Sequence, residues 1–116
     1  MSNIAQQIAA SKVYGGDKGK IPSYLEQEVL TWSKEKIILK MYDLFLVSAK
    51  KGDVSKMNRV LIELMSSLNF EYEEVSSRLY RLYEYCQRLI VQRKYNDAYL
   101  IIKELRVTWA QAFNIE

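Results

Sequence analysis

The distribution of glycine and proline constrains this chain of 116 residues more than any other feature. Pro22, which is the one proline, and three of the four glycines lie within the first 22 residues, and the fourth is Gly52. Both residue types favour turns and interrupt helices, so a chain nearly free of them beyond residue 22 favours long helices. The sequence therefore predicts a flexible N-terminal arm, residues 1–22, followed by one helical domain, residues 23–116.

Capping residues and short turns divide this domain into four expected helices. Their expected ranges are about 34–50, 54–68, 72–93 and 97–113. Ser33, Asp53 and Asn96 are of the type that caps helix N-termini, and Gly52 suits a helix C-terminus. Because short connections make each helix fold back on its neighbour, the sequence predicts an all-α fold, an antiparallel up-down four-helix bundle.

One face of each expected helix carries apolar residues at the helical period. The faces expected in the core are, in chain order, Ile37, Ile38, Met41, Phe45 and Ala49; Val54, Met57, Leu61, Leu64, Met65 and Leu68; Val75, Leu79, Leu82, Cys86, Leu89 and Ile90; and Ala98, Ile102, Leu105, Trp109 and Phe113. Cys86 lies in the middle of its face, so we interpret it as a small buried hydrophobe without a redox role.

A second group of apolar residues lies outside these core faces. Leu39, Tyr42 and Leu46 widen the apolar arc of the first helix. The later helices add Ile62, Tyr80, Val91, Tyr99, Leu100 and Val107 beside or opposite their core faces. One exposed leucine needs no explanation, but several on adjacent helices predict an apolar groove for a partner segment or for the arm. Ordinary packing at the helix flanks is the alternative interpretation.

The inventory of reactive residues argues against an enzyme. The chain has no histidine and a single cysteine, so common zinc sites, serine–histidine catalysis and an internal disulfide are excluded. Glu73 and Glu74 are expected to be partners of a helix dipole. We therefore expect no catalytic residue, no metal and no cofactor.

Charge and hydropathy give weaker constraints on partners. The net charge of +3 is mild, and no segment is long and apolar enough for a membrane span, so we expect a cytoplasmic protein without membrane insertion. Arginines and tyrosines alternate around Arg78–Arg93, which keeps a small nucleic-acid-binding bundle as an alternative. Glu74 and Glu84 on the same side of that helix weigh against it.

Four strings in the chain resemble the FliS family of flagellar export chaperones, in the family's order. They are YLEQEVLTWSKEKIILKMYDLF (Tyr24–Phe45), IELMSSLNFE (Ile62–Glu71), LYRLYEYCQRLIVQ (Leu79–Gln92) and IIKELRVTWAQAF (Ile101–Phe113). In the first string the matching positions are Tyr24, Val29, Thr31, Ser33, Glu35, Ile38, Tyr42 and Asp43. The strings also depart from the family. Trp32, Lys34 and Leu44 stand where the family has alanine, proline and glycine, and the chain is shorter between Asp43 and Met65.

The resemblance implies a cytoplasmic chaperone that binds the C-terminal segment of flagellin, prevents its premature polymerisation and keeps it competent for flagellar type III export. On that basis the expected partner surface joins Ile62, Tyr80, Val91, Tyr99, Leu100 and Val107. The resemblance also implies that the N-terminal segment caps part of the groove, with Tyr24, Leu25 and Val29 as its apolar contacts and Tyr42 and Asp43 nearby.

The sequence is also compatible with other partners. A FliS-like adaptor with a different secreted or flagellar-assembly client is the main alternative, and other flagellar export proteins are possible partners. Weak self-association through the same groove is also compatible with the sequence. Nucleic acid is the least favoured partner.

Overall fold

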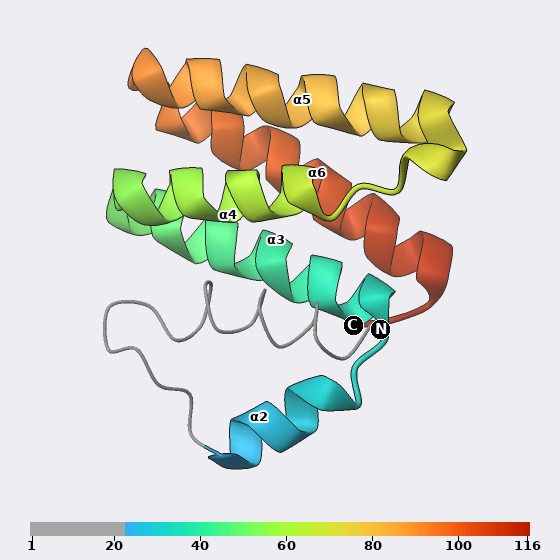
Figure 1. The fold of residues 1–116 in the computed structure, drawn as a ribbon. Coiled ribbons are helices and arrows are strands. Elements are labelled where there is room, and N and C mark those ends of the chain that lie inside the picture. The colour runs from blue at the N-terminus through green and yellow to red at the C-terminus, as the bar shows by residue number, and fades with distance from the viewer. Residues whose placement is uncertain (1–22) are drawn as a thin grey trace.

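The computed structural model describes residues 23–116, and the elements of this part of the chain are all helical (Figure 1). They are α2 (Ser23–Leu30), α3 (Lys34–Lys51), α4 (Val54–Ser66), the 3-10 helix η3 (Phe70–Tyr72), α5 (Glu73–Val91) and α6 (Tyr95–Phe113). The predicted all-α class is confirmed for this range. The predicted arm, residues 1–22, lies outside the described residues. Helix α2 was not expected from the sequence.

The predicted caps of the first two long helices are confirmed. The Ser33 hydroxyl accepts a hydrogen bond from the backbone N–H of Lys36 at 3.1 Å, and the Asp53 carboxylate accepts one from Lys56 at the same distance. Gly52 ends α3 in the left-handed region with φ of 68°, which glycine adopts without a steric penalty. Local sequence therefore decides where α3 ends and α4 begins.

The start of α6 differs from the prediction. The helix begins at Tyr95, its N-cap is Lys94, and no side chain caps it, so the expected cap at Asn96 is wrong. The preceding turn is closed by backbone bonds instead: the N–H of Arg93 donates to Ile90 and that of Lys94 donates to Leu89. This backbone-closed turn lets α6 begin two residues earlier than a cap at Asn96 would allow.

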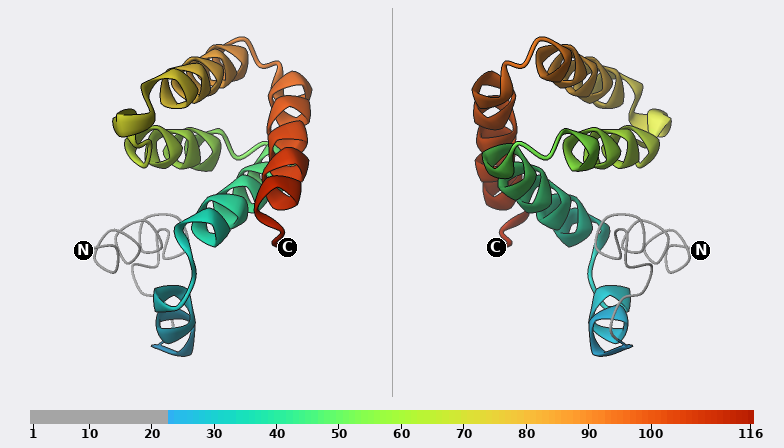
Figure 2. Two further views of the ribbon diagram at one scale, coloured as in Figure 1. Left: turned by 90° about the vertical axis from the view of Figure 1, so that its right-hand side faces the viewer. Right: turned by 90° about the vertical axis from the view of Figure 1, so that its left-hand side faces the viewer.

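Helices α3 to α6 pack around one core. Successive helices run in opposite directions, as the colour order of Figure 1 shows, and each contacts the next one in the chain. The first and last of them, α3 and α6, also share an extensive contact, so the four helices enclose the apolar residues between them. Figure 2 shows that α3 and α6 are inclined to α4 and α5 rather than parallel to them.

The core confirms most of the expected apolar faces. Its buried members are Val29, Trp32, Ile37, Met41, Tyr42, Phe45, Ala49, Met57, Val60, Leu61, Leu64, Tyr83, Cys86, Leu89, Ile90, Ala98 and Ile102. Three expected core residues are exposed: Val54, Val75 and Phe113 retain 36%, 60% and 45% of their accessible surface. Each lies in the first or last turn of its helix, where the neighbouring helices no longer cover it.

Two tyrosines are buried where the sequence did not place them in the core. Tyr42, like Leu39, was assigned to surplus apolar surface, yet both have no accessible surface. Tyr83 on α5 was not assigned to the core and is 1% exposed. The core therefore extends over a wider arc of α3 and α5 than a single apolar seam requires.

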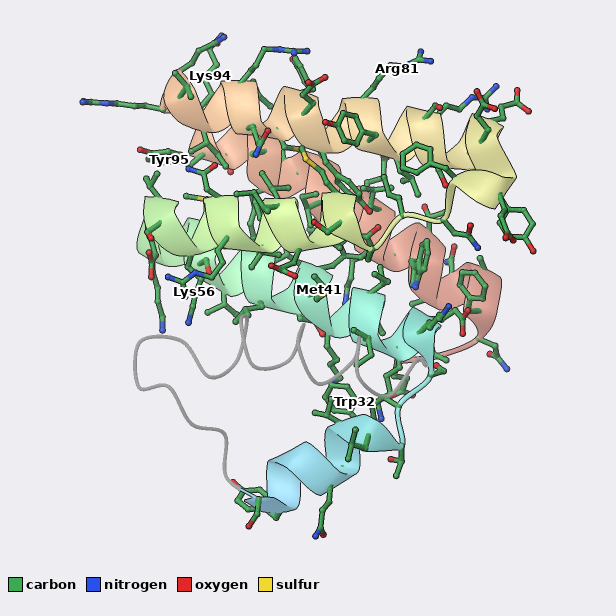
Figure 3. All side chains as sticks on the ribbon, viewed as in Figure 1. Trp32, Met41, Lys56, Arg81, Lys94 and Tyr95 are labelled. Atoms are coloured by element: carbon green, nitrogen blue, oxygen red, sulfur yellow. The ribbon has the colours of Figure 1, made fainter. Side chains whose placement is uncertain are left out.

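Helix α2 is joined to this core at its C-terminal end. Val29 is 1% exposed and Trp32 is 8% exposed, and both belong to the apolar cluster shared by the long helices. The ammonium of Lys36 lies 5.0 Å from the centre of the Trp32 ring. Figure 3 shows Trp32 between α2 and α3, so this residue connects the short helix to the rest of the structure.

Candidate partner-binding surface

The inner side of α6 is attached to α3 by an ion pair. Arg106 donates to the two carboxylate oxygens of Asp43 at 2.6 and 3.4 Å, and the two side chains retain about a third of their accessible surface. The bond to Asp43 raises the pKa of the Arg106 guanidinium above its ordinary value. Sequence analysis placed Asp43 near the N-terminal cap, whereas the structure pairs it across the two helices.

Trp109 provides the second connection between these helices. Its indole N–H donates to the carbonyl of Glu35 in the first turn of α3 at 2.9 Å. The ring meets Tyr42 edge-to-face at 6.0 Å and Phe113 at 4.8 Å. Such aromatic pairs contribute beyond their buried area, so Trp109 holds the C-terminal half of α6 against the N-terminal half of α3.

Tyr42 connects α3 to α5 as well. Its hydroxyl lies 2.7 Å from the hydroxyl of Tyr83, and this bond is buried. The pKa of Tyr42 is raised to about 12, because burial raises it by more than the hydrogen bond with Tyr83 lowers it. Burial also raises the pKa of Tyr83, and the proximity of Tyr42 raises it further. Both phenols therefore stay neutral at physiological pH, and one of the two hydroxyls donates a hydrogen bond to the other.

Cys86 is buried in the same interior and makes no disulfide. Burial raises the pKa of its thiol to about 12. A thiol that stays protonated is a poor nucleophile, so the interpretation of Cys86 as a packed hydrophobe agrees with its surroundings.

The outer side of α6 is different in character. Leu100 and Val107 retain 53% and 46% of their accessible surface. They share a shallow, open depression with Ile101, Lys103 and Glu104. We call these five residues the α6 patch. Because an α-helix advances 100° per residue, Leu100 and Val107 stand seven residues apart, close to the same line along the helix. The structure thus brings together two of the six residues predicted to bind a partner.

The other four predicted contacts lie on different parts of the surface. Ile62 is 52% exposed on α4, which is separated from α6 by its neighbours α3 and α5. Tyr80 and Val91 are 40% and 81% exposed on α5, beside α6. Tyr99 packs partly against the core, with the ammonium of Lys50 4.7 Å from its ring centre. The structure therefore places the six residues in more than one surface region.

The residues expected in the N-terminal cap also separate. Tyr24 is 73% exposed at the start of α2, whereas Val29 is part of the core. The side chain of Leu25 lies outside the described part of the structure. Tyr42 is fully buried and so presents no surface to a cap. Of this group, Tyr24 and the partly exposed Asp43 remain accessible.

Residues 23–116 contain neither a side-chain cluster suited to a metal ion nor a helix suited to crossing a membrane. Within residues 23–116 no three histidine, cysteine, aspartate or glutamate side chains gather in a way that could hold a metal ion. None of the helices in the same range combines the length and the apolar character that crossing a membrane requires.

Comparisons with known proteins give one match. The family described as flagellar protein FliS matches residues 47–116, which is more than half of the chain. The matched range contains α4, α5 and α6 and the C-terminal end of α3, and so includes the α6 patch. No curated protein and no solved structure matches the chain.

Proposed function

This chain belongs to the flagellar protein FliS family, and on that basis we propose that it is a cytoplasmic export chaperone for flagellin. The family is a chaperone family with a flagellar client rather than a family of enzymes. In the proposed role the protein binds the C-terminal segment of flagellin, prevents its polymerisation and keeps it competent for type III export. The antiparallel four-helix bundle would serve as the rigid surface for this client.

The exposed α6 patch is the observation that carries the proposal. Leu100 and Val107 retain about half of their accessible surface and are not members of the core cluster, and they lie together on the outer side of a helix whose inner side is bonded to α3. Helices that polymerise through apolar faces expose those faces when they are alone, and an apolar groove on a stable bundle can cover them. Tyr80, Val91 and Tyr99, on α5 and α6, would extend the contact, and Ile62 would belong to a second stretch of a long client.

In this proposal fewer residues of the predicted N-terminal cap are available to contact the groove than the sequence predicted. Val29 anchors α2 in the core, whereas Tyr24 is an accessible apolar contact on α2. Tyr42 and Asp43 act within the bundle, where they hold α5 and α6 against α3. We propose that the N-terminal segment caps part of the groove and that Tyr24 is one of its apolar contacts.

The experiment is a binding measurement with a synthetic C-terminal peptide of flagellin. Leu100→Asp with Val107→Asp should weaken binding by about 1–4 kcal/mol, the usual range for truncating the anchors of an apolar site. The matched control is Val75→Asp. It introduces an acid at a residue that is 60% exposed at the start of α5, away from α6. Calorimetry gives the affinities, and circular dichroism checks that each variant folds.

The outcome separates the proposal from its alternative. Unchanged affinity in the double variant would remove the α6 patch from the flagellin site. An adaptor for a different client is favoured by one observation: the family match begins at residue 47 and leaves out the string Tyr24–Phe45. If the tagged protein recovers another secreted subunit from flagellated cells and no flagellin, the adaptor is the correct function.

A further inference from the structure

One end of the molecule collects positive charge from two turns that are far apart in the sequence. Both the α3–α4 turn and the α5–α6 turn lie at the left of Figure 1, and Lys56 and Lys94 are labelled there in Figure 3. Lys50, at the end of α3, contacts the ring of Tyr99 in α6, which confirms that the turns are adjacent. We call this region the basic end, formed by Lys50, Lys51, Lys56, Arg88, Arg93 and Lys94.

The basic end accounts for the positive charge of the whole chain. Its six cations face two carboxylates in the same turns, Asp53 and Asp97, so six minus two gives a local charge of +4. The full sequence carries +3. The rest of the chain is therefore slightly acidic, and the charge is distributed unevenly over the molecule.

Arg93 occupies a position where arginine is unfavourable for folding. Its φ is 62°, in the left-handed region, and it follows α5 as the residue at which glycine is usually found. The backbone bonds to Ile90 and Leu89 close this turn, and glycine would form them equally well. A side chain with a Cβ is strained in this conformation, so the stability of the fold does not explain an arginine here.

Two further cations, Lys94 and Lys56, also occupy positions that are unfavourable for helix stability. Lys94 is the N-cap of α6, a position that favours serine, threonine or aspartate, and its side chain makes no capping bond. Lys56 lies in the first turn of α4, close to the positive end of the helix dipole. Lys50, Lys51 and Arg88, by contrast, lie in last turns, where a cation is favourable. Three of the six cations of the basic end thus occupy positions that are unfavourable for helix termination, helix capping or the helix dipole.

An exposed aliphatic side chain lies within this charged region. Val91, in the last turn of α5 and two residues before Arg93, retains 81% of its accessible surface, more than any other exposed large hydrophobic residue described. Val54 in the first turn of α4 retains 36%. A surface that combines cations with an aliphatic anchor fits a segment with the opposite charge and an apolar residue of its own.

We propose that the basic end binds an acidic segment of a partner protein, in which carboxylates flank an aliphatic side chain that packs on Val91. The carboxylates would pair with Arg93, Lys94 and Lys56. The ammonium groups of Lys50 and Lys103 lie within 6 Å of the centre of the Tyr99 ring and would compete with a base for stacking on it. This surface includes none of the five residues of the α6 patch, and it adjoins the proposed flagellin contact at Val91 and Tyr99.

The decisive variant removes charge while improving the fold. Arg93→Gly with Lys94→Ser places glycine at the left-handed residue and a good capping residue before α6, so the midpoint of urea unfolding should rise. Binding of a synthetic helical peptide of glutamate and leucine should weaken roughly threefold to tenfold at low salt, as expected for two exposed charge pairs. Val91→Ser should weaken the same binding. A peptide with lysine in place of glutamate should not bind.

The matched control removes the same charge from the N-terminal half of α5. Arg78→Gln with Arg81→Gln alters two exposed arginines, of which Arg78 pairs with Glu74, and should change the affinity by less than about twofold. Equal loss in the two double variants would mean that only net charge matters, and this would overturn the proposal. Undiminished binding in Arg93→Gly with Lys94→Ser would do so as well.

Two other occupants are tested with the same proteins. The basic end is a nucleic-acid site if a single-stranded oligonucleotide binds and the acidic peptide does not. In that case the Arg93→Gly with Lys94→Ser variant loses binding of the oligonucleotide. If sedimentation shows self-association that this variant abolishes, and the peptide does not bind, the occupant is a second copy of the chain. The Leu100→Asp and Val107→Asp variant should bind the acidic peptide normally, which keeps this result independent of the flagellin measurement.

Discussion

The two sides of α6 illustrate how differently one helix can be used. Toward α3 it presents Arg106 and Trp109, which make an ion pair with Asp43 and a hydrogen bond to the Glu35 carbonyl. Away from α3 it presents Leu100 and Val107, which retain about half of their accessible surface. The polar groups of the inner side have defined partners, whereas these two apolar side chains of the outer side remain partly exposed.

The difference shows which residues fix the helix in place and which are available for a partner. Hydrogen bonds and ion pairs are directional, so those on the inner side fix the register of α6 against α3. Apolar contact is not directional, so a surface patch of leucine and valine can accept a client in more than one register. If this division is correct, substitutions on the two sides should separate stability from binding.

The largest effect is expected at Trp109. Replacing it with alanine removes the indole from between α3 and α6 together with its bond to Glu35, and should lower the free energy of unfolding by about 3 kcal/mol. Leu100→Ala on the outer side should change it by less than about 0.5 kcal/mol. Urea unfolding followed by circular dichroism measures both. Similar losses of unfolding free energy in the two variants would show that the two sides of α6 contribute equally to stability.

A smaller effect is expected at the buried tyrosine pair. Tyr42→Phe or Tyr83→Phe leaves the remaining hydroxyl buried without its partner, which costs about 1–3 kcal/mol of unfolding free energy. The double variant removes both hydroxyls and should lose less than the sum of the single variants. Additive losses in this double-mutant cycle would show that the two hydroxyls are not coupled.

The same pair predicts a dependence on high pH with a definite sign. Because the folded pKa values are raised, the neutral pair stabilises the fold fully below the ordinary tyrosine value of about 10. Above this value the unfolded chain ionises and the folded one resists, so stability falls as the pH rises toward 12. The double phenylalanine variant should lose less stability over this interval than the unmodified chain.

The smallest effect on stability is expected from the Asp43–Arg106 pair. Its side chains are about one-third exposed, so Asp43→Asn should cost about 0.2–1 kcal/mol, and added salt should reduce the difference. A double-mutant cycle with Arg106→Gln isolates the coupling between the two groups. A coupling that is absent at low salt would mean that Trp109 and the aromatic contacts alone hold α6 in register.

Local features of the fold were predictable because they depend on neighbours in the chain. Ser33, Asp53 and Gly52 define helix ends through bonds to residues within four positions, and such contacts can be inferred from sequence spacing. Tyr83 could have been assigned to the core as well. It continues the helical series of Leu79, Cys86 and Ile90.

The candidate sites could be predicted from the sequence only in part. Exposure of Leu100, Val107 and Ile62 follows from helix periodicity, and the structure agrees with it. Their grouping does not follow, because periodicity places a residue on a face of its own helix without indicating which helices are neighbours. The basic end could not be predicted from the sequence for the same reason, because Lys56 and Arg93 are far apart in the chain.

The sequence by itself determined that the chain is helical, where most helices begin and end, and that it resembles the FliS family, because these depend on local propensity and on strings of adjacent residues. Only the tertiary structure decided that Tyr42 meets Tyr83, that Asp43 meets Arg106, and that two distant turns form one basic end. These outcomes depend on how helices pack across the core. That packing combines many weak contacts between distant segments, which no local pattern encodes.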